Sequence, residues 1–380
     1  MTMKNGKKNI LIIMGRYLPG FKDGGPIRTI KNLVDYLGDE YNFKILTCDR
    51  EVGEDRPYNN IIVNGWNAVG KASVYYVPPN GFKFSVIKKL SKDVDLVYSC
   101  GCFSDYAIKT LILKRLKRIG VPVVIASMGS FSPMEFKLKY KKKIFTNIFN
   151  FLGMFDNVFW SVTSEVEKED VKRQINCKGN FFIATDLPRK VEDTRIIKEK
   201  DVGKLNIIWL SRIAPNKNLK GAIDIIKNIK GDIKFTIYGP KQDFEYWEEC
   251  EIELNKLPNN IKWDWKGSVD SENVVETFKK HHVFLFPTFG ENFGHVIQEA
   301  LSAGCPVLLS DKTPWIDIEK ENIGLVAPIE DKKVYQDQLE LYVKMDQKEF
   351  QCISDKAVQY AINHSKKTIN ETGYRAIFNM

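Results

Sequence analysis

The chain has 380 residues, of which 43% are hydrophobic and 28% charged, and its net charge is +9 at pH 7. At roughly 150 residues a domain this length predicts about two globular domains, and no apolar run approaches the ~18 residues of a membrane span. The seven cysteines lack paired spacing and the four histidines form no convincing zinc set. We therefore expect a protein of the cell interior with no structural metal.

The first half of the chain alternates apolar runs with helical patterns. We expect strands at 9–14, 43–47, 73–77, 96–99, 121–127, 157–161 and 181–184, and helices at 26–37 and 106–118. A glycine-rich loop, residues 15–26, follows the first strand, and Pro26 fits the first turn of a helix. Backbone N–H groups of such a loop suit an anion. The spacing is not G-x-G-x-x-G, however, so Gly24 and Gly25 also fit an ordinary tight turn.

Asp93 and Asp95 form a D-x-D pattern, which one class of glycosyltransferase uses to hold a metal ion. They stand immediately before an expected strand at 96–99. We therefore interpret them as a loop-to-strand transition rather than as a metal site.

A basic segment precedes an apolar-rich stretch at 144–155. Its five lysines are Lys137, Lys139, Lys141, Lys142 and Lys143. The pattern predicts a basic amphipathic helix that binds an anionic membrane surface or a polyanionic substrate. A solvated helix face beside a core-facing one is the alternative. No nucleic-acid-binding module accompanies the charge, so we expect no nucleic acid as a partner.

The second half repeats the alternation after a charged stretch at 187–204, which we interpret as a linker. Expected strands lie at 205–210, 234–238, 261–265, 283–286 and 307–309, with helices at 219–226, 273–280 and 294–303. The fold class is therefore α/β, with two Rossmann-like doubly wound domains in tandem. We place the domains at 1–188 and 189–365, and expect residues 366–380 to return to the first.

Ligands of such sheets bind beyond the carboxyl ends of the strands. Arg212 and Lys217 supply two cations about one loop apart, which suits a diphosphate. Glu291 and Glu299 are then better used as acceptors of sugar hydroxyls. N–H groups of residues 292–295 add to the anion site.

Three segments resemble retaining family-4 glycosyltransferases of the GT-B fold. PTFGENFGHVIQEALSAGCPVLLSD resembles their E-x7-E region, with Glu291 and Glu299 as the two glutamates. SRIAPNKNL is similar to their diphosphate loop and contains Arg212 and Lys217. LPGFKDGGPIRTIKNLVDYLG resembles their N-terminal glycine loop.

This resemblance implies two domains facing a cleft and a metal-independent, retaining transfer from a UDP- or GDP-linked sugar to a hydroxyl acceptor. No cofactor is implied. Arg212 and Lys217 would stabilise the departing diphosphate, and Glu291 would position the sugar. The nucleotide-sugar site would comprise Gly24, Gly25, Ser211, Gly239, Lys266, Gly267, Asn292, Phe293, Gly294, His295, Val296 and Glu299. Surface polysaccharide or glycolipid assembly is the implied process, in the cytoplasm or on the inner face of the plasma membrane.

The chain departs from the family pattern in two places. Residues 125–130 contain Met128 but lack the histidine that many members carry near the transferred sugar. The usual Pro-Asn-Gly turn is replaced by residues 184–188. Two alternatives therefore remain: a sugar-nucleotide epimerase or phosphorylase on the same fold, and a non-catalytic binding partner that keeps the fold.

Overall fold

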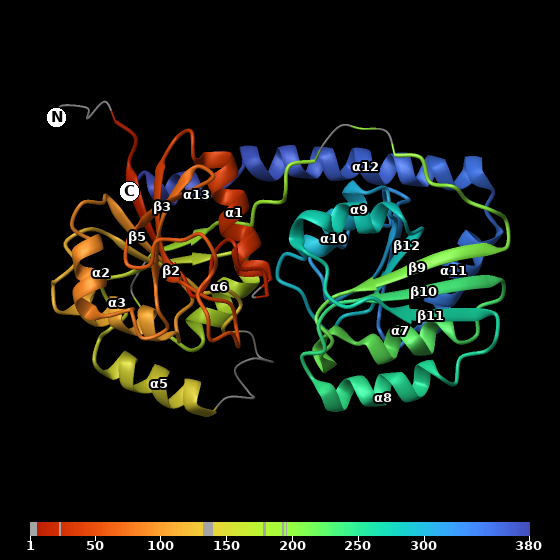
Figure 1. Ribbon diagram of the computed structural model, residues 1–380, viewed down its shortest axis with the longest axis horizontal. Coiled ribbons are helices and arrows are strands. Elements are labelled where there is room, and N and C mark those ends of the chain that lie inside the picture. Colours follow the sequence, from red (N-terminus) through yellow and green to blue (C-terminus); the bar gives the residue numbers. More distant parts are fainter. Residues whose placement is uncertain (1–5, 23, 132–139, 178–179, 192–193, 195) are drawn as a thin grey trace. The chain divides into compact units, whose positions relative to one another are not determined.

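The computed structural model describes residues 6–22, 24–131, 140–177, 180–191, 194 and 196–380. The chain divides into two compact units (Figure 1). The first comprises Met1–Leu187 with Thr368–Met380, and the second comprises Pro188–Lys367. Each unit contains one sheet covered by helices, and each is described here by itself.

The first unit is built on an eight-stranded sheet in the order β3-β4-β2-β1-β5-β6-β7-β8. Its strands are β1 Asn9–Ile13, β2 Asn42–Cys48, β3 Trp66–Val69, β4 Ala72–Val77, β5 Leu96–Cys100, β6 Val123–Ala126, β7 Phe159–Val162 and β8 Phe181–Ile183. Neighbouring strands are parallel except at the β3–β4 edge, which is antiparallel. The strand order reverses between β1 and β5, and the crevice beyond their carboxyl ends is the usual ligand position in such a fold.

Alternate side chains of β1 enter two separate cores. Ile10 and Ile12 face one core, whereas Leu11 and Ile13 face the other. The first core is covered by α1 (Gly25–Leu37) and α13 (Tyr374–Phe378). The second is covered by α2 (Phe84–Leu90), α3 (Asp105–Arg115), α5 (Tyr140–Phe151) and α6 (Glu165–Lys172). Burial on both faces explains why these strands are continuous apolar runs.

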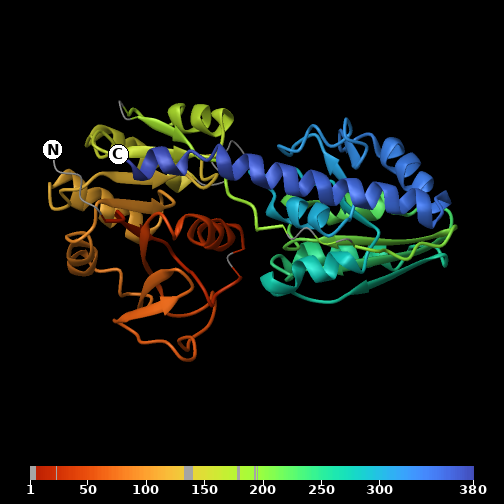
Figure 2. The same ribbon diagram turned by 90° about the horizontal axis from the view of Figure 1, so that it is seen from above.

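The last helix belongs to the first unit although it ends the chain. Phe378 is fully buried and its ring lies 5.2 Å from that of Tyr41 and 5.6 Å from that of Phe43. Arg375 pairs with Glu40, with a closest distance of 2.8 Å. Figures 1 and 2 show α13 against the sheet of this unit.

The second unit has a six-stranded sheet in the order β11-β10-β9-β12-β13-β14, with every pair parallel. Its strands are β9 Lys204–Leu210, β10 Asp232–Tyr238, β11 Ile261–Trp265, β12 Val283–Phe286, β13 Val307–Ser310 and β14 Gly324–Ala327. Its helices are α7 Leu219–Ile226, α8 Phe244–Leu254, α9 Val274–Lys279, α10 His295–Ser302, α11 Lys332–Lys344 and α12 Gln347–Asn370, which runs on into the first unit. Here the strand order reverses between β9 and β12.

Two elements of the first unit escape sequence-based prediction. Strand β3, Trp66–Val69, has no fully buried residue, so it lacks the apolar signal of a central strand. Helix α2, Phe84–Leu90, is only seven residues long, with Ile87 as its single buried side chain. The expected helix at 106–118 is also shorter, because Lys117 adopts a left-handed conformation (φ 55°).

The charged stretch at 187–204 is not a solvated linker throughout. The Lys198 ammonium is buried and donates to the carbonyl oxygens of Phe278, at 2.8 Å, and His281. It therefore satisfies orphan carbonyls at the end of α9. Burial lowers the pKa of Lys198 to about 8. The charged composition predicted a linker, and it does not reveal that a lysine of this stretch has buried carbonyl partners.

Candidate active site

The reversal point of the second sheet holds an ion pair. Lys217 Nζ lies 2.5 Å from Glu291 Oε1, and both side chains are largely buried. Lys217 ends a short 3-10 helix, Pro215–Lys217, in the loop after β9, and Glu291 stands in the loop after β12. Because β9 and β12 are neighbours, residues 74 positions apart meet at one sheet edge. Removing one partner from a buried pair typically costs about 3–5 kcal/mol.

Asn218 fixes the two loops against each other. It adopts a left-handed conformation (φ 55°), and its side chain caps α7 by accepting from the Gly221 N–H at 3.1 Å. The same amide donates to the Pro287 carbonyl at the end of β12 (2.7 Å). In addition, the Phe289 N–H donates to the Asn216 carbonyl at 3.0 Å. The geometry of the ion pair is therefore set by rigid neighbours.

Arg212, the second predicted cation, is exposed in the same loop. Its guanidinium donates to Gln242 Oε1 at 3.0 Å, from the loop that follows β10. The structure thus brings both predicted cations to one sheet edge, with Arg212 facing solvent and Lys217 buried. Ser211, also in this loop, donates its N–H to the Tyr238 carbonyl at 3.1 Å.

Gly239 and Gly267 follow β10 and β11 at the same edge. A Cβ on Gly239 (φ 135°) would lie 1.7 Å from the Ser211 carbonyl oxygen, so only glycine fits there. Its N–H donates to the Gly267 carbonyl at 2.8 Å. Lys266 is exposed and pairs with Asp264. Of these three predicted residues, the two glycines therefore set the backbone geometry at the carboxyl ends of the strands, and Lys266 is exposed beside them.

The E-x7-E stretch continues into α10. Gly294 precedes the helix in a left-handed conformation (φ 77°), and the Phe293 carbonyl accepts from the Trp315 indole at 2.6 Å. Phe293 and His295 are buried with their rings 4.7 Å apart. Asn292 is exposed and Val296 half-buried. Glu299 is only 5% exposed, so it is not a solvated residue of the helix surface.

The predicted glycine loop lies at the carboxyl end of β1 in the first unit. Gly24 has φ 65° and ψ −115°, a conformation open to glycine, and it directly precedes α1. No described atom lies within 4 Å of a Cβ built on Gly24 or Gly25. The backbone is therefore accessible here, as close approach of a ligand requires.

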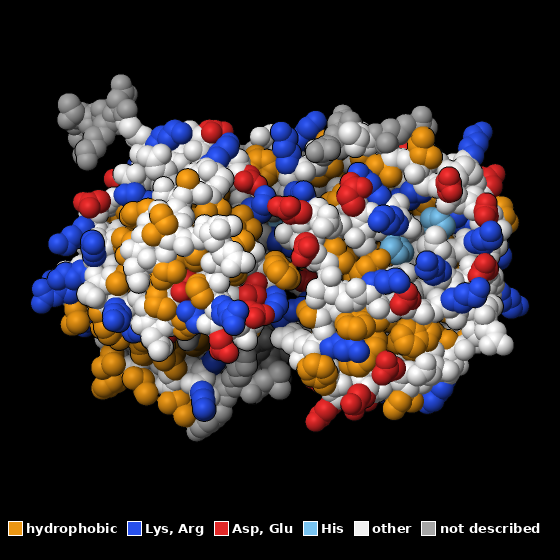
Figure 3. Space-filling model, viewed as in Figure 1, with side chains coloured by type: hydrophobic (Ala, Val, Ile, Leu, Met, Phe, Trp, Pro, Cys, Tyr) orange, Lys and Arg blue, Asp and Glu red, His pale blue; other side chains and the backbone are white. Residues whose placement is uncertain are grey.

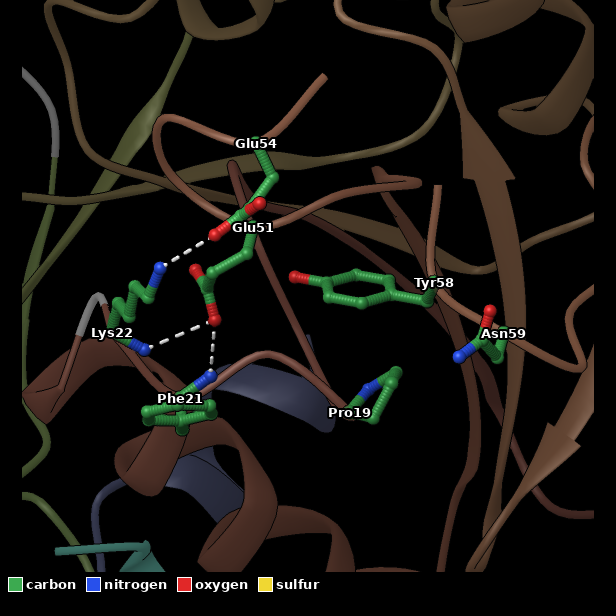
Figure 4. Close-up of a pocket in the computed structure, with 7 residues that line it drawn as sticks. All are labelled: Pro19, Phe21, Lys22, Glu51, Glu54, Tyr58 and Asn59. Carbon is green, nitrogen blue, oxygen red and sulfur yellow. Dashed lines mark hydrogen bonds and ion pairs between the residues drawn. The ribbon is translucent and has the colours of Figure 1, made fainter. Parts of the chain in front are cut away.

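Glu51, which was not predicted from the sequence, holds this loop in place by hydrogen bonds. Its buried carboxylate accepts the N–H groups of Phe21 (2.8 Å) and Lys22 (3.2 Å), as Figure 4 shows, and also the N–H of Val52 (2.9 Å). Burial alone would raise the pKa of this carboxyl, but the three donors hold it below its ordinary value. A hollow of about 480 Å³ opens beside it. It is lined by Pro19, Phe21, Lys22, Glu51, Glu54, Tyr58 and Asn59.

The D-x-D residues have a structural role. Asp95 accepts the Asn9 N–H at 2.7 Å, and it lies at the amino end of β5, away from the ligand-binding edge. Within the described residues, no three His, Cys, Asp or Glu side chains are close enough together to hold a metal ion.

The basic segment is partly described. Lys137 and Lys139 lie outside the described residues, whereas Lys141, Lys142 and Lys143 belong to α5. Hydrophobic side chains gather over this helix (Figure 3). The exposed apolar residues are Ile144, Ile148, Phe151 and Leu152, and Phe151 is 90% exposed. No helix in the described part of the chain has the length and apolarity to span a membrane.

Comparison with known proteins shows which family and which fold this chain resembles. Residues 190–359 match the family of glycosyl transferases group 1. The structure of Anabaena HepE in complex with UDP and glucose superposes with a TM-score of 0.67 at 13% identity, covering 98% of this chain and 100% of that one. The chain has the GT-B fold, and the family match falls within its second unit, Pro188–Lys367.

Two curated relatives extend the comparison. The poly(glycerol-phosphate) alpha-glucosyltransferase of Bacillus subtilis is 29% identical over 56% of this chain, but the match spans only 33% of that protein. An uncharacterised 41.2 kDa protein of the Klebsiella pneumoniae cps region is 24% identical over 65% of this chain and 69% of its own length. The family match and the first relative's name agree with the predicted glycosyltransferase function.

Asp186 provides a pH-dependent group at the edge of the first sheet. Although the residue reaches the surface in part, its carboxyl is enclosed and bonded to Thr29 and Tyr374. Burial and, to a smaller extent, nearby Glu167 raise the pKa of Asp186 to about 7, against the opposing effect of the hydrogen bonds from Thr29 and Tyr374. The folded protein therefore retains a proton that the unfolded chain loses near pH 4.

We predict that stability contributed by protonated Asp186 is present below pH 4 and lost as the pH rises to about 7. The Asp186→Asn variant cannot ionise at this position. The free energy of unfolding, measured by denaturant titration, should therefore fall between pH 4 and 7 more steeply for the wild type than for the variant. Parallel pH profiles would show that Asp186 has an ordinary pKa.

Proposed function

We propose that the protein is a retaining, metal-independent glycosyltransferase that moves a sugar from a UDP- or GDP-linked donor to a hydroxyl acceptor. The observation that carries the proposal is the Lys217–Glu291 pair at the reversal point of a glycosyltransferase group 1 domain. The name of the Bacillus subtilis relative, a glucosyltransferase of poly(glycerol-phosphate), supports our proposal that the acceptor belongs to a surface polysaccharide or a glycolipid.

The ion pair supports an exchange of partners on donor binding. A diphosphate carries more negative charge than one carboxylate, so it competes with Glu291 for Lys217. Once its cation is engaged elsewhere, Glu291 has acceptor capacity for hydroxyl groups of the sugar. A small displacement of the two side chains would then let Lys217 bind the phosphate and Glu291 contact the sugar.

The chemical step depends on charge that develops on the leaving group. As the glycosidic bond lengthens, the nucleoside diphosphate gains negative charge, which Lys217 and Arg212 stabilise. Two fixed cations supply the neutralisation that a divalent ion provides in other enzymes. The leaving phosphate then accepts the proton of the acceptor hydroxyl on the same face of the sugar, which retains the anomeric configuration. Glu291 orients the ring, and Glu299 accepts hydrogen bonds from hydroxyls of the donor.

The first unit is the proposed acceptor side. The hollow beside its glycine loop combines the rings of Tyr58 and Phe21 with the polar heads of Lys22 and Glu54. Aromatic faces with nearby hydrogen-bonding groups suit a sugar, which has apolar C–H faces and a polar rim.

We predict that Lys217→Met abolishes donor-dependent thermal stabilisation and lowers transfer at least ~10²-fold, because transition-state charge is no longer balanced. Thermal shifts and nucleotide release would be measured with UDP-glucose and GDP-mannose. Lys220→Met is the matched control, since Lys220 lies three residues away on the surface, paired with Glu249.

The double variant Lys217→Met/Glu291→Gln separates catalysis from folding, because it leaves no unpaired carboxylate. It should fold as the wild type does and remain inactive. Retained transfer in this variant would contradict the role of Lys217. Acceptor-free isomerisation of a sugar nucleotide by the wild type would favour an epimerase instead.

We further propose that the outward face of α5 binds an anionic membrane surface, which would bring the enzyme to a lipid-linked acceptor. Lys141 and Lys143 are exposed beside the apolar residues Ile144, Ile148 and Phe151. Apolar insertion and basic attraction together make such a helix interfacial. Lys142 is not part of this face, because its amino group donates inward to the Ser130 carbonyl at 3.0 Å.

We predict that Lys141→Glu/Lys143→Glu weakens flotation with phosphatidylglycerol-containing liposomes at least ~10-fold, since each lysine near the surface contributes about 1 kcal/mol. Lys88→Glu/Lys89→Glu makes the same charge change on the exposed surface of α2. Equal loss in both variants would indicate dependence on net charge alone and contradict the assignment to α5.

A further inference from the structure

Trp315, which was not predicted from the sequence, contacts the loop that carries Glu291. It lies in the segment after β13 and is only 4% exposed. Its indole N–H donates to the Phe293 carbonyl at 2.6 Å. In the same segment, the Lys312 carbonyl accepts the Glu291 N–H at 3.3 Å. The segment after β13 therefore holds the loop after β12 at two positions.

The indole fixes the orientation of one peptide group. The Phe293 carbonyl and the Gly294 N–H belong to the same peptide plane, and the bond between these residues is trans. In a trans peptide the carbonyl and the N–H point in opposite directions. Because the Phe293 carbonyl points to the buried indole of Trp315, the Gly294 N–H points away from that indole.

The Gly294 N–H is a buried donor at the start of a helix. Gly294 is buried and directly precedes α10, yet its N–H donates to no atom in the part of the chain that the structure describes. Buried backbone donors are nearly always paired, so this N–H indicates a ligand that accepts from it. The macrodipole of α10 favours an anionic acceptor at this position.

The indole is itself held by close packing. A Cβ on Gly294 would lie 3.2 Å from Trp315 Nε1 and 2.8 Å from Ile297 Cδ1, so glycine (φ 77°) lets the indole approach the backbone. The ring centroids of His364 and Tyr360, both in α12, lie 4.5 and 6.4 Å from that of Trp315. Burial lowers the pKa of His364 to about 4, so near pH 7 its imidazole packs as an uncharged ring.

We propose that Trp315 is a positioning residue of the nucleotide-sugar site, which orients the Phe293–Gly294 peptide so that the Gly294 N–H binds a phosphate of the donor; this inference rests on the proposed transferase function. A hydrogen bond to a charged acceptor is stronger than one between neutral groups. A donor that is already oriented also needs no rearrangement when the anion binds, so less binding energy is lost in ordering the loop.

The test compares the same tryptophan-to-phenylalanine change at two buried positions. Trp315→Phe keeps an aromatic ring but removes the N–H that is bonded to Phe293. Trp247→Phe is the matched control, because Trp247 is 3% exposed and its Nε1 has no hydrogen-bond partner among the described residues. Affinities for UDP and uridine, and for GDP and guanosine, are measured by ligand-observed NMR for each protein, together with the Tm.

We expect Trp315→Phe to weaken binding of the nucleotide roughly 10-fold and to change binding of the matching nucleoside, which has no phosphate, less than about twofold. A partly folded variant would lose affinity for both ligands by the same factor, so the ratio of the two affinities reports on the oriented N–H alone.

An unchanged ratio in Trp315→Phe, or an equal change of the ratio in Trp247→Phe, would overturn the positioning role and leave the transferase proposal standing. If the wild type binds neither UDP nor GDP, both proposals fail together.

Discussion

The ion pair between Lys217 and Glu291 is the contact on which the second unit's site depends. It joins the loops of two neighbouring strands, β9 and β12, at the place where the strand order reverses. Both side chains are largely buried, so truncating either one would leave the other charge without a partner. In the proposed function, an incoming diphosphate takes over Lys217 while sugar hydroxyls take over Glu291, so that both charges keep a partner.

The first unit has the opposite arrangement of buried charge. Its carboxylates Glu51 and Glu167 are bonded mainly to backbone N–H groups and hydroxyls rather than to lysine. Such carboxylates fix loop conformation and remain in place when ligand arrives. The glycine loop after β1 and the turn after β6 are therefore each held by a buried carboxylate. The proposed site of the second unit thus depends on an ion pair, whereas these two loops of the first unit are held by hydrogen bonds to carboxylates.

The sequence predicts the GT-B fold well, because buried parallel strands such as Val283–Phe286 are uninterrupted apolar runs and α7 repeats its apolar residues at helical spacing. The position of Arg212, Lys217 and Glu291 at one edge of the second sheet is also predictable, because each lies in a loop that follows a strand. The short edge strand β3 and the anchors Glu51, Glu167 and Gln242 are not. Glu51 is 30 residues from the Phe21 amide, and a carboxylate bonded to distant backbone leaves no local pattern.

The central claim is that two fixed cations support transfer with retention of configuration. NMR of the product formed from UDP-glucose and an acceptor glycan, in the presence of EDTA, tests this claim most directly. Because the donor is α-linked, the account predicts a new α-glycosidic bond at an undiminished rate without divalent ions. A β-linked product, or transfer that requires added magnesium or manganese, would contradict it.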